Sequence, residues 1–168
     1  DLTDQKVWSK AVKDTAGLRE FYNKNKNNYL WGDRADVTTY RCTDEKIAAE
    51  VRKMLAKNKS EKEILEVINK TSQLNLTVEN VMFLKGENKN VDDNWKEGIV
   101  SKNIKDDKDS KFLVIKVNKI IPKSPKALNE ARGAVTADFQ VNLEKEWIAY
   151  LKNKYPVKID DAVLKTVK

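Results

Sequence analysis

Residues 111–122 read KFLVIKVNKIIP and give the clearest strand pattern in the chain. Within this segment Phe112, Leu113, Val114 and Ile115 form a continuous apolar run, and there is no Gly or Pro before the last residue, which predicts a buried β-strand. Residues 35–42, ADVTTYRC, are also β-branched and aromatic, and they predict a second strand. A third strand region, LTVENVMFLKG, lies at 76–86. These three segments predict a small sheet.

Helices are expected between the first two of these strands along the chain. Thr43 or Asp44 is placed to cap one helix, and Ser60 with Glu63 forms the capping-box pattern of the next. After the strand region at 76–86, the polar loop ENKNVDDN leads to an aromatic residue and a short turn. The expected buried face of the first helix comprises Ile47, Ala48, Val51, Met54 and Leu55.

The flanking segments have helical periodicity. Residues 1–34 predict two helices, with Trp8 in the apolar stripe of the first and Thr15 as the N-cap of the second. A long helix is expected from about Lys126 to about Asn153, followed by an extended stretch and a helical turn within 156–168. The predicted stripe of the long helix comprises Ala131, Val135, Phe139, Leu143, Trp147 and Leu151.

This order of elements predicts an α+β fold with a small, mostly antiparallel sheet, N-terminal helices and one long C-terminal helix. We expect residues 1–34 to pack on the C-terminal helix, residues 35–122 to form the sheet domain, and residues 123–168 to contain the long helix and a tail. A chain of 168 residues is long enough to bury such a core.

The composition excludes several kinds of site. The chain contains no His, which removes His-based acid–base catalysis, the usual catalytic triads and His-ligated metal sites. Its single cysteine, Cys42, excludes an internal disulfide and is expected to be a buried apolar side chain. We therefore expect no catalytic residue, metal or cofactor.

Charge and hydropathy limit the expected partners. The net charge is +7, but Lys alternates with Asp and Glu along the chain instead of clustering with aromatic residues, so no nucleic acid is expected. No apolar run approaches the roughly 20 residues that span a bilayer. The chain opens with the polar DLTDQKVW and carries no signal-peptide pattern, so we expect a mature fragment whose targeting sequence has been removed.

The order of the middle segments, from the strand at 35–42 through Gly98–Ser101 to the strand at 111–122, resembles the parvulin-type prolyl-isomerase domain. The segments at 18–29 and 128–160 are similar to the helices and short strand around this domain in SurA- and PpiD-type envelope chaperones, in versions common in Bacteroidetes. The resemblance implies a parvulin-like fold and location in the periplasm or at the outer membrane.

The resemblance also shows where this chain departs from the family pattern. Leu113 stands where the last strand of the family usually carries a His. The other family His corresponds to Thr38, Thr39 or Tyr40, and ENKNVDDN replaces a Gly-rich stretch. Because these positions are altered together, we expect a degenerate domain that has lost isomerase activity and binds unfolded or proline-containing polypeptide or serves as a scaffold, together with other domains of the same chaperone.

Two alternatives stay open. Prolyl isomerisation has a barrier of roughly 20 kcal/mol and needs an apolar pocket and a twisted amide but no covalent step, so an active isomerase with an altered pocket is one alternative. A helical protein-interaction module, which uses the apolar stripe of the long helix, is the other. The candidate peptide-binding pocket comprises Tyr40, Cys42, Met82, Trp95, Phe112 and Leu113.

Overall fold

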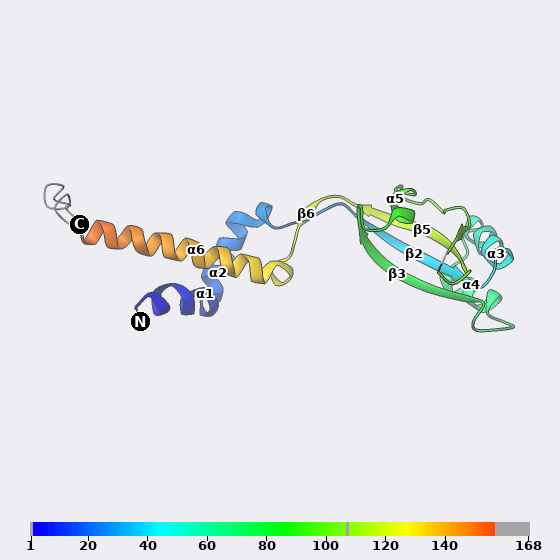
Figure 1. Cartoon of the computed structure of the whole chain (residues 1–168), viewed down its shortest axis with the longest axis horizontal. Helices are drawn as coiled ribbons and strands as arrows, with labels where there is room; N and C mark the ends of the chain where they lie inside the picture. Colours follow the sequence, from blue (N-terminus) through cyan, green and yellow to red (C-terminus); the bar gives the residue numbers. More distant parts are fainter. Residues whose placement is uncertain (1, 107, 157–168) are drawn as a thin grey trace, which may run out of the picture. The chain divides into compact units, whose positions relative to one another are not determined.

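A computed structural model describes residues 2–106 and 108–156. The extended stretch and helical turn expected within 156–168 lie, beyond Pro156, outside the described residues. The chain divides into two compact units (Figure 1). The sheet unit is Trp31–Ser124, and the helical unit combines the chain up to Leu30 with the chain from Pro125 onward. Strands β1 (Leu30–Trp31) and β6 (Ser124–Pro125) pair with each other.

The sheet unit is built on four antiparallel strands in the order β3-β2-β5-β4. This arrangement confirms the α+β class and the three strands expected from the sequence. The long central strands carry buried apolar side chains on both faces, and helices or loops cover both faces of the sheet. The strands are β2 (Arg34–Cys42), β3 (Leu76–Leu84), β4 (Ile104–Lys105) and β5 (Phe112–Ile121).

One face of the sheet, called the α3 face, is covered by α3 (Glu45–Ala56) and α4 (Glu61–Ile68). Asp44 caps α3 by accepting from the backbone N–H of Ile47 at 2.9 Å. The capping box of Ser60 and Glu63 begins α4, as expected. The buried cluster of the α3 face comprises Tyr40, Cys42, Ala48, Val51, Leu55, Ile64, Leu76 and Val114.

The opposite face, called the α5 face, is covered by the chain around α5 (Lys89–Asp92). This short helix lies inside the segment that was expected to be a polar loop. It forms because the Asn88 side chain accepts from the backbone N–H groups of Asn90 and Val91, and Val91 is buried. The buried cluster of the α5 face comprises Ala35, Val37, Val91, Ile115 and Val117, with Phe83, Trp95, Ile99, Ile104 and Ile120 packed against it.

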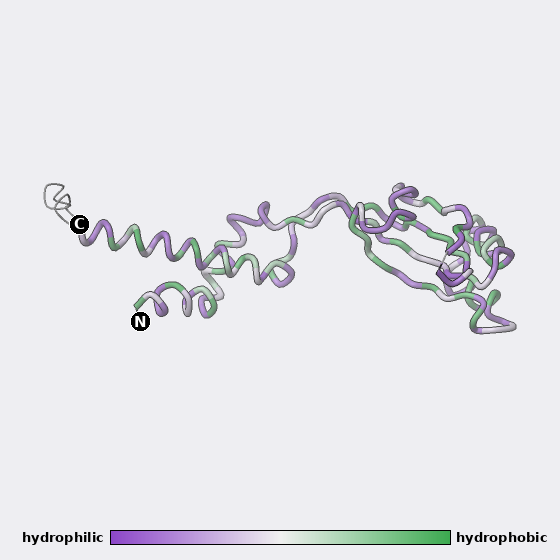
Figure 2. Tube along the Cα trace, in the orientation of Figure 1, coloured by the Kyte–Doolittle hydropathy of each residue, from purple (hydrophilic) through white to green (hydrophobic). Residues whose placement is uncertain are grey.

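In the helical unit, the π-helix η1 (Asp4–Trp8), the helices α1 (Ser9–Lys13) and α2 (Thr15–Asn25) and the 3₁₀-helix η2 (Lys26–Asn28) precede the unit boundary. The long helix α6 (Leu128–Lys154) follows it, and apolar and polar residues alternate along its length (Figure 2). The buried cluster comprises Val7, Ala11, Leu18, Tyr29, Ala131, Val135, Phe139 and Leu143.

Two local predictions in the helical unit are wrong. The N-cap of α2 is Asp14, whose carboxylate accepts from the backbone N–H of Gly17 at 2.8 Å, and Thr15 is already helical. Trp8 is 49% exposed instead of lying in the buried stripe. The buried stripe runs through Val7 and Ala11, because only this side of the N-terminal helices meets α6.

Candidate functional site

The pairing of β2 with β5 assigns each candidate residue to a face of the sheet. Directly opposite residues of an antiparallel pair point to the same face, and neighbours along a strand point to opposite faces. Leu113 lies opposite Arg41, so Thr39, two residues along β2, shares its face. Thr38 and Tyr40 point to the α3 face. Of the three positions considered for the second family His, only Thr39 therefore accompanies Leu113 on the α5 face.

The structure does not bring the six candidate pocket residues together. Tyr40 and Cys42 are buried in the core of the α3 face, and Phe112 packs against the same cluster. Met82 lies opposite Asp36 on this face but is 45% exposed. The remaining two candidates, Trp95 and Leu113, lie on the α5 face. Leu113 lies on the opposite face from Phe112 because the two are consecutive residues of one strand. Trp95 packs against the buried cluster of the α5 face.

Burial decides the chemistry of the two polar candidates on the α3 face. It raises the pKa of the Cys42 thiol to about 12, with a smaller contribution from Asp44. Burial also raises the pKa of Tyr40, and Glu61 adds to this effect. Both groups are therefore neutral near pH 7, and Cys42 is a packing residue instead of a nucleophile.

Trp95 is held on the α5 face from two sides. Its ring packs against the cluster that contains Val37, and the Lys85 Nζ lies 5.0 Å from the ring centroid. The turn that follows runs along the edge of β5. It needs a glycine at Gly98, where φ is +78°, and the hydroxyl of the buried Ser101 accepts from the backbone N–H of Ile115 at 2.9 Å. The Gly98–Ser101 turn thus has a structural role.

Arg41 is a neighbour of Leu113 that was missed as a site residue. Its Nη1 donates to Asp106 at 3.0 Å and to Asp109 at 2.9 Å, which ties the β4–β5 hairpin to β2. The backbone N–H of Lys108 and the Arg41 guanidinium hold the pKa of Asp106 below its usual range. The period-two pattern of β2 contained the signal, because it places Arg41 on the same face as Thr39.

Comparison of the sequence with known protein families identifies the family of this chain. Residues 14–133 match the PPIC-type PPIase domain, which is more than half of the chain. The chain belongs to the PPIC-type PPIase domain family. The parvulin-type resemblance that the sequence predicts is therefore confirmed, and Thr39 and Leu113 can be described as positions in a PPIC-type PPIase domain. No curated protein matches the chain.

Solved structures of similar proteins are distant in sequence. A Campylobacter jejuni protein, from a study of PEB4 and Cj1289 as two structurally related SurA-like chaperones, is 19% identical over 87% of this chain and 64% of its own, with a TM-score of 0.40. PrsA from Bacillus subtilis is also 19% identical, over 93% and 62% of the two chains, with a TM-score of 0.36. The peptidylprolyl isomerase PrsA from Bacillus anthracis is 14% identical over 86% and 70%, with a TM-score of 0.32. The chain thus spans under two thirds of the first two proteins.

A polar network of this PPIC-type domain lies on the α3 face of the sheet. The Thr38 hydroxyl donates to the Asn80 Oδ1 at 2.6 Å and accepts from the Asn118 Nδ2 at 2.9 Å. Thr38 is only 5% exposed. The pairing of β2 with β5 shifts by one residue between Asp36 and Val37, and Asn118 is the extra residue of β5. Asn118 follows Val117, which lies on the α5 face, so its side chain points to the α3 face and reaches Thr38.

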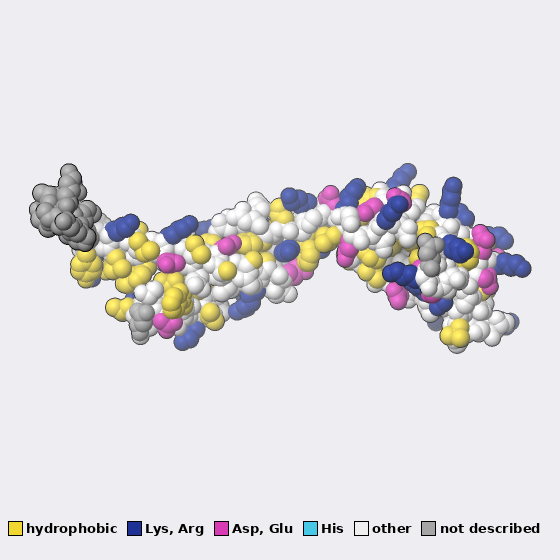
Figure 3. All heavy atoms as spheres, viewed as in Figure 1, with side chains coloured by type: hydrophobic (Ala, Val, Ile, Leu, Met, Phe, Trp, Pro, Cys, Tyr) yellow, Lys and Arg dark blue, Asp and Glu magenta, His cyan; other side chains and the backbone are white. Residues whose placement is uncertain are grey.

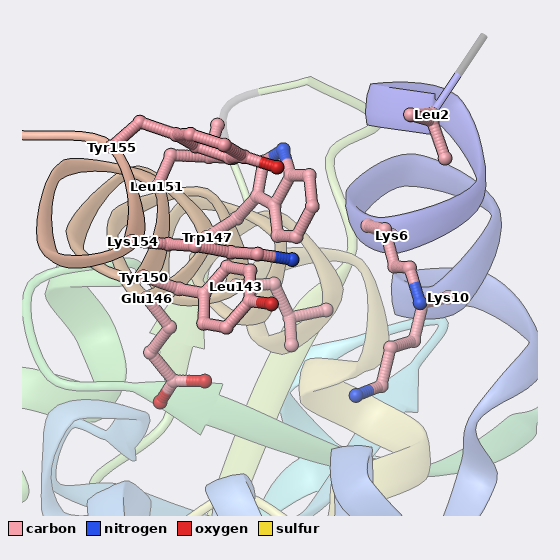
Figure 4. Close-up of a pocket in the computed structure, with 10 residues that line it drawn as sticks. All are labelled: Leu2, Lys6, Lys10, Leu143, Glu146, Trp147, Tyr150, Leu151, Lys154 and Tyr155. Atoms are coloured by element: carbon pink, nitrogen blue, oxygen red, sulfur yellow. The ribbon is translucent and has the colours of Figure 1, made fainter.

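A cavity of about 620 Å³ lies in the helical unit (Figure 4). Its aromatic wall contains the stacked rings of Trp147 and Tyr150, whose centroids are 5.4 Å apart. The Lys154 Nζ lies 5.5 Å from the ring centroids of Tyr150 and Tyr155. Sequence reasoning did not single out this cavity, because its walls come from both ends of the chain. The lining residues are Leu2, Lys6, Lys10, Leu143, Glu146, Trp147, Tyr150, Leu151, Lys154 and Tyr155.

Lys and Arg side chains lie among Asp and Glu side chains over the visible face (Figure 3). Residues 2–106 and 108–156 contain no group of three or more Cys, Asp or Glu side chains placed to hold a metal ion. Among the helices of those same residues, none combines the length and the apolar character needed to cross a membrane.

Proposed function

We propose that residues 35–122 form a degenerate parvulin-like domain that binds unfolded or proline-containing polypeptide without isomerising it. The observation that carries this proposal is the shared face of Thr39 and Leu113: the resemblance to parvulins implies one His at Leu113 and another at Thr38, Thr39 or Tyr40, and of these three only Thr39 lies on the face of Leu113. A Leu side chain has no polar atom, and a Thr hydroxyl does not titrate near neutral pH. The neighbouring cation of Arg41 already contacts two carboxylates.

The wider role is also a proposal. PPIC-type family membership and the similarity of the flanking helices to SurA- and PpiD-type chaperones support a chain that works in an envelope folding chaperone. Location in the periplasm or at the outer membrane, and cooperation with other domains of the same chaperone, follow from that resemblance. Secretion of a tagged full-length protein, followed by cell fractionation, tests the location.

An isomerisation assay tests the central claim. A protease-coupled assay and NMR exchange spectra of a proline-containing peptide should show no acceleration by this chain, whereas fluorescence anisotropy should show that it binds an unfolded polypeptide. Acceleration comparable to that of an active parvulin overturns the proposal and favours the alternative of an active isomerase. The variant with Thr39→His and Leu113→His is the matched comparison: a gain of activity there shows that the α5 face is the reaction face.

A second candidate function, a helical interaction module, is favoured by the cavity of the helical unit. Tyr150 is 49% exposed and Tyr155 60% exposed beside it. The part of the α6 stripe around Phe139 is not free for a partner, because this ring lies 5.4 Å from the ring of Phe21. Light scattering coupled to size-exclusion chromatography tests the version in which two copies pair; a monomer at all concentrations excludes that version.

A further inference from the structure

Strand β3 is an edge strand of the four-stranded sheet, with β2 as its neighbour on one side (Figure 1). It is nine residues long and most of its side chains are exposed. Val81 is 37% exposed, Met82 45% and Leu84 37%. A long exposed edge of this kind has backbone donors and acceptors to which another extended chain can bind.

Alternation along β3 shows which backbone groups face outward. Beyond its two ends, Lys85 donates to Asp33 at 2.9 Å and the Asn75 carbonyl accepts from Thr43 at 3.0 Å. In an antiparallel pair, residues that bond to the neighbouring strand alternate with residues whose N–H and C=O point away from it. Because residues 75 and 85 bond inward, the odd-numbered residues of β3 bond to β2 and the even-numbered residues face outward.

Side chains cap both ends of this outward edge. At one end, the Leu76 N–H donates to the Asn69 Oδ1 at 3.0 Å, and the Asn69 Nδ2 donates to the Leu76 carbonyl at 2.9 Å. At the other end, the Leu84 N–H donates to the Glu87 carboxylate at 2.8 Å, and the Glu87 N–H donates to the Leu84 carbonyl at 3.1 Å. Both capped residues are even-numbered, which agrees with the alternation.

Between the two caps, the outward backbone groups of Val78, Asn80 and Met82 have no hydrogen-bond partner within the described part of the chain. Three such residues correspond to an added strand of about five residues, since every second residue bonds across. We propose that this uncapped stretch of β3 binds an extended segment of unfolded polypeptide by strand addition. The inference rests on the proposed function and assigns it a binding site.

The side chains beside the uncapped stretch of β3 determine which side chains the bound polypeptide segment should carry. On the α3 face, the Asn80 Nδ2 donates to the Glu61 carboxylate at 3.2 Å, so a side chain opposite Asn80 meets a negative charge. Glu79 places a second negative charge on the α5 face. Val78 and Met82 flank this centre on the α3 face. The segment that fits therefore has basic residues in its middle and apolar residues at its ends.

A labelled peptide with the segment Val-Thr-Lys-Lys-Val tests this with the full chain, by fluorescence anisotropy. It should bind, and the Val-Thr-Glu-Glu-Val peptide should bind at least about fivefold more weakly. Its Glu side chains would face Glu61 and Glu79, and the interaction energies of opposite and like charges across strands differ by enough to give such a ratio. N-methylation of alternate peptide amides is the backbone test. Methylation of the set that faces β3 should abolish binding, whereas methylation of the other set should leave it within about twofold, since those amides point away.

The matched protein variants are Met82→Pro and Met82→Ala. Pro removes the outward N–H, which the ladder with β2 does not use, so the sheet should stay folded. Met82→Pro should weaken peptide binding about fivefold or more, and Met82→Ala less than about twofold, because Ala keeps the N–H. The circular dichroism spectrum of each variant checks the fold, and the N-methylated peptides repeat the test on the unaltered protein.

Four results overturn the inference. Equal sensitivity of binding to both sets of N-methylated peptides shows that β3 is not pairing with the peptide backbone. Binding of an unfolded polypeptide that is the same for the unaltered chain and for Met82→Pro rejects the β3 site while the proposed function stands; no polypeptide binding at all rejects both. In the fourth result, the unaltered chain instead forms a dimer that Met82→Pro dissociates, and it binds no peptide. That result assigns the β3 edge to a second copy of the chain and also overturns the inference.

Discussion

Replacement of Thr38 by Val tests the assignment of faces on which the site depends. The two side chains have nearly the same shape, so the substitution removes the hydroxyl and little else. Thr38 is 5% exposed, and its hydroxyl makes hydrogen bonds of 2.6 Å with Asn80 and 2.9 Å with Asn118. At about 1 kcal/mol for each net hydrogen bond, we expect Thr38→Val to lower the free energy of unfolding of the sheet unit by about 2 kcal/mol.

Thr39→Val is the control, with the same chemical change at the next residue. The Thr39 hydroxyl makes no side-chain hydrogen bond in the described part of the chain and is half-buried on the α5 face. Its replacement should change the free energy of unfolding by no more than about 0.5 kcal/mol. Urea titration followed through the NMR signals of β5 amides measures the sheet unit by itself. Equal effects of the two substitutions, or a larger effect at Thr39, would refute the assignment of faces.

Three further predictions concern single groups. Burial and the hydrogen bond to Asp138 raise the pKa of Tyr29 to about 12. A raised pKa stabilises the folded state below the unfolded value of about 10 and loses this contribution as the pH rises toward 12, so thermal melts should show an alkaline loss that Tyr29→Phe lacks. The buried Cys42 thiol should react with a thiol reagent only on unfolding; rapid alkylation of the native protein would contradict its burial. A hydrogen bond from Lys59, and after it hydrogen bonds from Ser60, lower the pKa of the Glu63 carboxyl to about 2. The capping box should therefore weaken as the pH falls from about 4.5 toward 2. Ser60→Ala should cost about 1 kcal/mol in urea denaturation at pH 7, and an unchanged midpoint would exclude the cap as a stabilising element.

Local patterns were sufficient for most elements. The three strands and the long helix follow from residue type and periodicity, and Asp44 and the Ser60–Glu63 pair begin their helices as expected. The α5 helix was missed because it is only four residues long and its cap is the Asn88 side chain within a polar segment. Trp8 was misplaced because the sequence of a short helix does not tell which of two apolar sides meets a distant helix.

The candidate pocket required information of another kind. Residue type identified large apolar side chains in the strands, but each strand carries such side chains on both faces, because both faces of this sheet are covered. Only the pairing between strands showed that Phe112 and Leu113 belong to different sides of the sheet. The Thr38 network depends in addition on strand pairing, which brings Asn80 and Asn118 to Thr38 across sequence separations of 42 and 80 residues.

The elements, the fold class and the absence of histidine could be predicted from the amino-acid sequence, because they depend on composition and on contacts between near neighbours. The parvulin-type resemblance was also present in the order of segments along the chain. The strand pairing was needed to show that Thr39 lies on the face of Leu113 and that β3 has an uncapped edge between Leu76 and Leu84. Both facts depend on strand register, which is set by the packing of the whole sheet and not by any single strand.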